Sequence, residues 1–251
     1  MTRVFNCLLK KELKSYFYSP LAYTVLFFFW ILSGLNFYWI LLQLADGEQF
    51  SEITQMLFCG PLVIFSLPVI SSLITMKLFS EEAKMGTLEM TLTTPISDLH
   101  LIFSKYLSAF IFYLILWVPY IIYINILNSL FLPLEEEVFN IGIFISSFIG
   151  IICIGLFYIS VGILMSAITS NQIIASVSSF GILFGSLIFF MFMGINTYDM
   201  SLRLIGKYFS TFDHFIGFSR GIIDTRILIF YFIHSIWIIF SIIKIIEWKR
   251  N

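Results

Sequence analysis

A serine with a histidine on either side in the sequence is one group in the chain that could do covalent chemistry. Residues 217–221 match the G-x-S-x-G pattern that presents a serine nucleophile in hydrolases, with Ser219 at the centre. His214 and His234 are the nearest candidates for a general base. That chemistry needs a sharp strand-to-helix turn, whereas residues 217–221 follow an amphipathic helical pattern. A serine hydrolase acting through Ser219 is therefore kept as an alternative.

Metal and nucleotide sites have weaker signals. The cysteines are odd in number and widely spaced in apolar surroundings, which is typical of small core residues: Cys7, Cys59 and Cys153. A P-loop needs G-x-x-x-x-G-K-[ST], but Tyr208 follows the Gly206-Lys207 pair and Ser201 stands where the first glycine belongs. The sequence therefore predicts no metal site and no cofactor on this chain.

Carboxylates in residues 77–105 could contact a partner through charge. Glu81, Glu82 and Glu89 are candidates for ion pairs with another protein. They could equally do no more than solvate the segment and balance Lys84, since exposed ion pairs contribute little to stability. Both interpretations stay open at the level of the sequence.

Local turn signals in the same segment predict a short helix. Gly86 can adopt the left-handed conformation that ends one helix, and Thr87 can cap the next, with Glu89 in its first turn. Pro95 forces the residue before it out of helical geometry, and Ser97 can start the following helix. We expect a helix of about two turns between Gly86 and Pro95, held between two breaks.

The elements that must position these residues are mostly apolar. Of the 251 residues, 59% are hydrophobic and 12% are charged, against about 25% charged in a typical soluble domain. The mean hydropathy is +0.98 and the formal net charge is −1. This composition excludes an ordinary soluble enzyme, and the chain has no basic stripe of the kind that indicates nucleic-acid binding.

Six apolar runs are each long enough to cross a bilayer, which takes about 20 helical residues. They lie at residues 21–44, 57–76, 106–127, 141–167, 173–195 and 227–246. The first run starts too late and is too long for a cleaved signal peptide, so we expect it to stay as an anchor. Glycines such as Gly155 and the Gly181-x-x-x-Gly185 pair predict close helix packing. The sequence therefore predicts an all-α membrane protein with six transmembrane helices, in which residues 1–251 form one domain.

Basic residues are distributed unequally between the ends of these runs. With the N-terminus inside, the inner segments hold Arg3, Lys10, Lys11, Lys14, Lys77, Lys84, Lys105, Lys244, Lys249 and Arg250. The outer segments hold Arg203, Lys207, Arg220 and Arg226. Because cytoplasmic segments are enriched in lysine and arginine, both termini and residues 77–105 are predicted to be cytoplasmic, and residues 196–226 to lie outside.

Residues 1–20 have a helical periodicity of their own. Apolar side chains recur on one face, at Phe5, Leu8, Leu9, Leu13, Tyr16 and Phe17. Lys10, Lys11 and Lys14 fall on the other face, and Pro20 ends the pattern. This predicts an amphipathic elbow helix lying in the inner headgroup plane, or else a charged cap that only orients the first span.

Residues 196–226 show a similar pattern before the last apolar run. One stripe is apolar: Leu202, Ile205, Tyr208, Phe209, Phe212, Phe215 and Ile216. A segment too short for a domain would lie in the outer interface or enter the membrane again as a helical hairpin, with its backbone groups hydrogen-bonded internally.

Three segments carry a resemblance to a known family, in order along the chain. The first is Lys11-Glu12-Leu13-Lys14-Ser15-Tyr16-Phe17-Tyr18-Ser19-Pro20. The second is Glu81-Glu82, Gly86-Thr87-Leu88-Glu89, Leu92, Pro95-Ile96-Ser97 and Lys105-Tyr106. The third is Phe218-Ser219-Arg220-Gly221-Ile222-Ile223-Asp224-Thr225-Arg226, followed by Phe230-Tyr231. Together they resemble the elbow, coupling loop and outer segment of type 2 ATP-binding-cassette (ABC) exporter permeases, closest to the gliding-motility subfamily.

The resemblance implies a permease subunit of the bacterial inner membrane that exports a substrate. A substrate path through these spans would be lined mostly by Phe, Ile, Ser and Thr, which favours a hydrophobic or amphipathic substrate. It implies a second permease subunit, identical or related, and a separate cytoplasmic P-loop ATPase that binds ATP and Mg. Coupling to the ATPase would involve Glu81, Glu82, Gly86, Thr87, Leu88, Glu89, Leu92 and Pro95. The elbow lysines would be Lys10, Lys11 and Lys14, and the outer motif would be Phe218, Arg220, Gly221, Asp224 and Arg226.

Other classes of membrane protein remain as alternatives. A secondary carrier or channel usually has several ionisable groups across the bilayer, whereas His234 and Lys244 in the last run are the ionisable residues of all six runs. A non-transporting membrane scaffold and the serine hydrolase are the other two.

Overall fold

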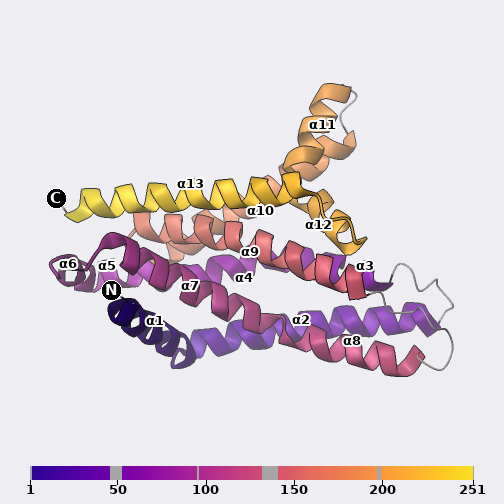
Figure 1. The fold of residues 1–251 in the computed structure, drawn as a ribbon, viewed down its shortest axis with the longest axis horizontal. Coiled ribbons are helices and arrows are strands. Elements are labelled where there is room, and N and C mark those ends of the chain that lie inside the picture. Colours follow the sequence, from indigo (N-terminus) through magenta and orange to yellow (C-terminus); the bar gives the residue numbers. More distant parts are fainter. Residues whose placement is uncertain (1, 46–52, 95, 132–140, 197–198, 251) are drawn as a thin grey trace.

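The computed structural model describes residues 2–45, 53–94, 96–131, 141–196 and 199–250, which form helices and connecting turns without any strand (Figure 1). Six segments within these ranges are long and apolar enough to cross a membrane: Pro20–Ala45, Pro61–Lys84, Asp98–Ser129, Gly142–Ile168, Gln172–Ile195 and Thr225–Arg250. The predictions of an all-α fold and of six candidate spans are confirmed.

The candidate spans lie side by side along the long axis of the molecule, so the bundle has two ends (Figure 1). One end holds α1 (Thr2–Phe17), α6 (Thr87–Leu92) and the two chain ends, and is called the α6 end. The opposite end holds α3 (Ile53–Cys59) and α12 (Thr211–Ser219), and is called the α3 end. Helix α11 (Met200–Phe209) projects sideways from the bundle.

The second candidate span starts later than the sequence predicted. Residues 57–59 belong to α3, and α4 (Pro61–Thr75) begins only after Gly60, whose φ of −54° and ψ of 138° are not helical. A β-carbon on Gly60 would lie 1.9 Å from Asn36 Oδ1, so the side chain of Asn36 on α2 (Pro20–Ala45) requires a glycine there. After Met76 the helix continues as α5 (Lys77–Lys84).

The third candidate span is longer than its apolar run. Helix α7 (Asp98–Leu116) begins after Ser97, as predicted, and α8 (Val118–Phe131) follows a break at Trp117. Pro119 lies in the first turn of α8, where its missing N–H leaves no helical hydrogen bond unmade.

Helix α9 (Ile141–Ile168) is packed so closely by its neighbours that three of its positions admit only glycine. A β-carbon would lie 2.7 Å from the Phe218 ring at Gly150, 2.3 Å from the Tyr113 ring at Gly155 and 2.0 Å from Thr75 Oγ1 at Gly162. The predicted close packing is therefore confirmed for α9. On α10 (Gln172–Asn196), Gly181 and Gly185 have no atom within 4 Å of such a β-carbon, so no described residue packs against that pair.

The segment before α13 (Thr225–Arg250) forms two helices rather than one continuous stripe. Ser210, in extended geometry, ends α11 and caps α12 by accepting a hydrogen bond from Asp213 N. The break divides the predicted apolar stripe into two parts with different surroundings. Leu202 on α11 is 44% exposed, whereas Phe215 on α12 is 1% exposed.

Candidate functional site

Helix α6 is a short element at the tip of the α6 end. Gly86 precedes it with a φ of 72°, which confirms the predicted left-handed residue. The prediction that Thr87 caps this helix is wrong, because Gly86 occupies the N-cap position and Thr87 is the first helical residue. The hydroxyl of Thr87 instead donates to Glu82 O at 3.3 Å, joining the start of α6 to the end of α5.

The two faces of α6 have opposite character. Leu88 and Leu92 are 4% and 7% exposed, so they anchor the helix to the rest of the chain. Met90 is 73% exposed, and Glu89 beside it is also exposed. With Met85, which is 63% exposed, they form a surface called the α6 tip: Met85, Thr87, Glu89 and Met90. Pro95, predicted to end this helix, lies outside the described residues.

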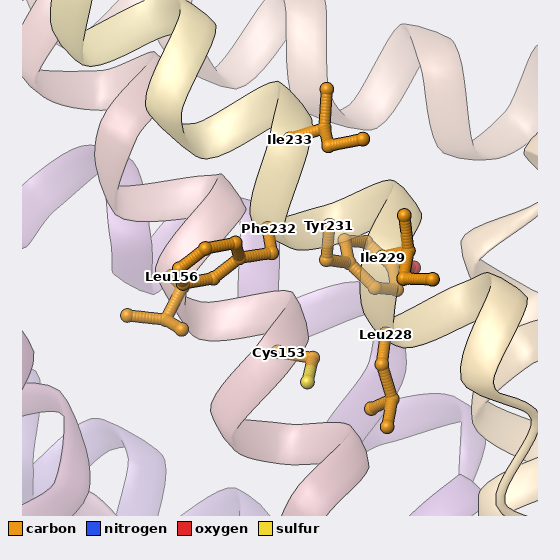
Figure 2. A pocket seen from close by; sticks show the side chains of 7 residues that line it. All are labelled: Cys153, Leu156, Leu228, Ile229, Tyr231, Phe232 and Ile233. Carbon is orange, nitrogen blue, oxygen red and sulfur yellow. The ribbon is translucent and has the colours of Figure 1, made fainter.

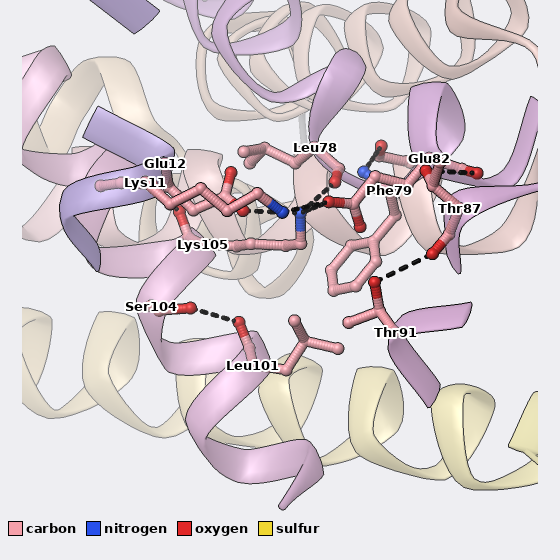
Figure 3. A network of polar contacts seen from close by, with 12 residues as sticks. Lys11, Glu12, Leu78, Phe79, Glu82, Thr87, Thr91, Leu101, Ser104 and Lys105 are labelled. Atoms are coloured by element: carbon pink, nitrogen blue, oxygen red, sulfur yellow. Dashed lines mark hydrogen bonds and ion pairs between the residues drawn. The ribbon is translucent and has the colours of Figure 1, made fainter. Parts of the chain in front are cut away.

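A buried lysine joins three helices just behind α6 (Figure 3). Lys105 Nζ on α7 lies 3.1 Å from Glu12 Oε1 on α1 and 2.9 Å from Glu82 Oε1 on α5. It also donates to Leu78 O at 2.7 Å, and its side chain is 1% exposed. A charge removed from water in this way is tolerated only when it is paired and hydrogen-bonded, as Lys105 is here.

Lys11 extends this group toward the surface. Its Nζ lies 3.6 Å from Glu82 Oε1 and its side chain is 63% exposed. Two lysines and two glutamates therefore form a group without net charge, called the Lys105 cluster: Lys105, Glu12, Glu82 and Lys11. A cavity of about 290 Å³ beside it is lined also by Lys77 and Glu81.

Sequence reasoning made Glu82 a candidate for contact with a partner protein, or else a residue that only solvates the segment, and it did not pair Glu12 with Lys105. The structure places Glu82 in an ion pair within the chain, while Glu81 lines the cavity and Glu89 is exposed. A signal for Glu12 was present, because it lies four residues from both Leu8 and Tyr16, on the apolar face of the N-terminal helix. Lys105 was counted as a loop residue, although it lies inside α7.

The apolar face of α1 contacts protein. Tyr16 donates from its hydroxyl to Ile74 O at 2.8 Å, and its ring stacks on Phe112 of α7 at 5.0 Å. Burial, and then the nearby Glu12 carboxylate, raise the pKa of Tyr16 well above its ordinary value. The elbow lysines Lys10, Lys11 and Lys14 are all exposed.

The C-terminal end of α13 ties down the chain around α6. Arg250 Nη2 lies 2.8 Å from Asp98 Oδ1 at the start of α7, and it donates to Ile96 O at 3.1 Å. Lys249 Nζ donates to Ala167 O at the end of α9, at 2.6 Å. The sequence used Arg250 and Lys249 only to predict the orientation in the membrane. In the structure they join the end of α13 to the start of α7 and the end of α9.

The outer motif forms the connection between α12 and α13. Phe218 is fully buried against Gly150, and its carbonyl accepts a hydrogen bond from the Ser146 hydroxyl. Gly221 has a φ of 84°, which permits the turn. Asp224 Oδ1 accepts from Arg226 N at 2.8 Å in the first turn of α13. These residues have structural roles in the turn, and Arg226 is exposed.

Ser219 lies at the end of a helix and its hydroxyl has non-basic partners. Its Oγ donates to Ile216 O at 2.8 Å and accepts from the Cys59 thiol at 3.1 Å. His214 Nδ1 contacts the Tyr231 hydroxyl at 3.0 Å, and His234 Nδ1 contacts Phe230 O at 2.7 Å. This geometry is not that of a nucleophile elbow.

An apolar groove of about 300 Å³ lies between α9 and α13 (Figure 2). Its walls include Cys153 and Leu156 from α9 and Phe232 and Ile233 from α13. Within a candidate span, such a lining is typical of a surface that faces lipid acyl chains or another apolar helix.

Compared with known proteins, the chain matches no protein-family model and no curated protein sequence.

Proposed function

We propose that this chain is the membrane-spanning permease subunit of an ABC exporter in the bacterial inner membrane, and that α6 docks onto a separate cytoplasmic ATPase. The observation that carries the proposal is the α6 tip, an exposed surface on a helix that is fixed to the bundle by Leu88 and Leu92. The sequence resemblance over residues 77–105 names the same segment as the coupling element.

The Lys105 cluster supplies a physical route from this tip to the spans. A partner can shift the permease only through contacts that differ between two states. Because Lys105 pairs with Glu12 and Glu82, helices α1, α5 and α7 are joined at one buried point, adjacent to α6. A displacement of α6 would then move α1 and α7 together rather than bend a slack loop.

The proposed orientation places the α6 end in the cytoplasm. The ten basic residues of the predicted inner segments lie in α1, α5, the first half of α7 and the C-terminal part of α13, which meet at the α6 end. This agrees with the enrichment of lysine and arginine on the cytoplasmic side. Thr93→Cys and Ser201→Cys, each made in a Cys7→Ser background, test this with an impermeant thiol reagent on intact cells. We expect labelling of position 201 alone, and labelling of position 93 from outside would overturn the orientation.

A second permease subunit would complete the transporter. The open Gly181-x-x-x-Gly185 face of α10 supports this part of the proposal, because small residues at this spacing let two membrane helices approach closely. The bilayer would cover the remaining apolar surface. ATP and Mg would bind to the ATPase and not to this chain.

Docking is tested by co-purification with a P-loop ATPase, which the proposal expects a neighbouring gene to encode. Met90→Asp and Glu89→Lys should release the ATPase, because they put charge, or the opposite charge, at the α6 tip. Met200→Asp is the matched control, since Met200 is 66% exposed but lies on α11. Retention of the ATPase by both tip variants, or its equal loss in the control, would contradict the proposal.

A further inference from the structure

A preformed cavity at the α3 end combines apolar walls with polar groups at its edge. It has a volume of about 360 Å³ and lies between α2, α3 and the start of α4. Trp39, Ile40, Met56 and Leu62 supply apolar lining, and Gln43 and Gln55 supply amides. The volume is at the small end of the roughly 300 to 1,000 Å³ of ligand pockets, so it suits one chain-like ligand better than a bulky one.

The walls of this cavity are held in place by Asn36 on α2. Its side chain is 6% exposed, and its Nδ2 donates to Leu57 O at 3.1 Å and to Met56 O at 3.3 Å. These bonds fix the end of α3 against α2, and the close contact of Asn36 with Gly60 sets the bend into α4. The cavity therefore follows from buried hydrogen bonds and not from loose packing.

Two sets of hydrogen-bond donors stand at the edge. Arg220 does not line the cavity itself, but its Nε donates to Oε1 of the lining residue Gln55 at 3.2 Å, and it forms no ion pair with any carboxylate of the described residues. A guanidinium has five N–H donors, so four remain after this bond. Gln43 is half-buried, and its amide makes no hydrogen bond with another described residue.

We propose that this cavity binds a single-chain amphiphile with an anionic headgroup. The chain lies between Ile40, Met56 and Leu62, and the headgroup accepts hydrogen bonds from Arg220 and Gln43. A guanidinium matches the paired oxygens of a carboxylate or phosphate better than any other side chain. Trp39 is 61% exposed beside the cavity, as is usual for tryptophan at a membrane–water boundary. The inference does not rest on the proposed function, because binding is a property of this chain alone.

Photo-crosslinking tests the site on the purified full chain in nanodiscs of zwitterionic lipid. The probe is palmitic acid with a diazirine on its chain, and labelled peptides are identified by mass spectrometry. We expect labelling of residues that line the cavity, competed by palmitic acid. Hexadecanol has the same chain without the charge, so it should compete at least about tenfold less well, since hydrogen bonds to charged groups are the stronger class. Inorganic phosphate has the charge without a chain, so it should also compete at least about tenfold less well, since it buries no apolar surface.

Two variants separate the chain from the headgroup. Leu62→Trp fills the cavity and should remove the labelling, while Arg220→Gln should weaken binding of palmitic acid about tenfold or more and leave hexadecanol unaffected. Arg226→Gln is the matched control, because Arg226 is also exposed but its side chain makes no hydrogen bond with a described residue that lines the cavity. The proposal is overturned if hexadecanol competes as well as palmitic acid, if labelling persists in Leu62→Trp, or if the residues that line the cavity are not labelled.

Discussion

The two ends of the bundle are held together by different forces. At the α6 end, full charges link separate helices, as Lys105 links Glu12 to Glu82 and Arg250 links α13 to Asp98. At the α3 end, the links described are aromatic rings against glycine and hydrogen bonds without an ion pair, as between Phe218 and Gly150 or Asn36 and Leu57. Buried ion pairs hold helix ends together more firmly than neutral contacts do, because paired buried charges are costly to separate.

The largest expected effect comes from Lys105→Met. It leaves Glu12 and Glu82 without their buried cation, and removal of one partner from a buried ion pair costs about 3–5 kcal/mol. We expect a clearly lower melting temperature in detergent or nanodiscs, measured by intrinsic fluorescence. Glu12→Gln and Glu82→Gln added to this variant should recover part of the loss, since they remove the uncompensated charges.

Lys244→Gln is the control for that measurement. Lys244 pairs with Glu247 at 2.7 Å, a distance similar to those at Lys105, but its side chain is 58% exposed. Exposed pairs of this kind contribute about 0.5 kcal/mol or less. If both lysine variants changed stability equally, burial would not be what distinguishes the α6 end.

Gly150→Val tests the packing of the α3 end and is expected to have the next largest effect. The new β-carbon would lie 2.7 Å from the Phe218 ring, and overpacking of this kind costs about 1–3 kcal/mol. Gly217→Val makes the same change on α12, where no atom lies within 4 Å of the new β-carbon, and should leave the melting temperature nearly unchanged. Equal destabilisation by the two variants would attribute the effect to the helix backbone and not to Phe218.

Features set by neighbouring residues could be predicted from the sequence, whereas contacts between distant residues could not. Hydropathy located all six candidate spans, because the length of an apolar run is a local property, and Gly86 was recognised because a left-handed residue is favoured by its own type. Lys105 and Glu12 of the Lys105 cluster are 93 positions apart in the sequence, so no local pattern could pair them. The break at Gly60 likewise depends on Asn36, which is on another helix.

The smallest expected effect is a pH dependence confined to the α3 end. His214 on α12 is 5% exposed and contacts the Tyr231 hydroxyl of α13, and burial lowers its pKa below the ordinary value, although Tyr208, Asp213 and Asp224 oppose the shift. The unfolded chain therefore binds the proton more tightly than the folded chain. The contribution of His214 is fully present above about pH 6.5 and is lost as the pH falls below it, by at most about 1.4 kcal/mol per pH unit. Melting temperatures of the parent protein and of His214→Gln between pH 7.5 and 5 should converge as the pH falls, and parallel curves would show that another group titrates. If Lys105→Met leaves this convergence unchanged, the two ends respond independently, as their different forces predict.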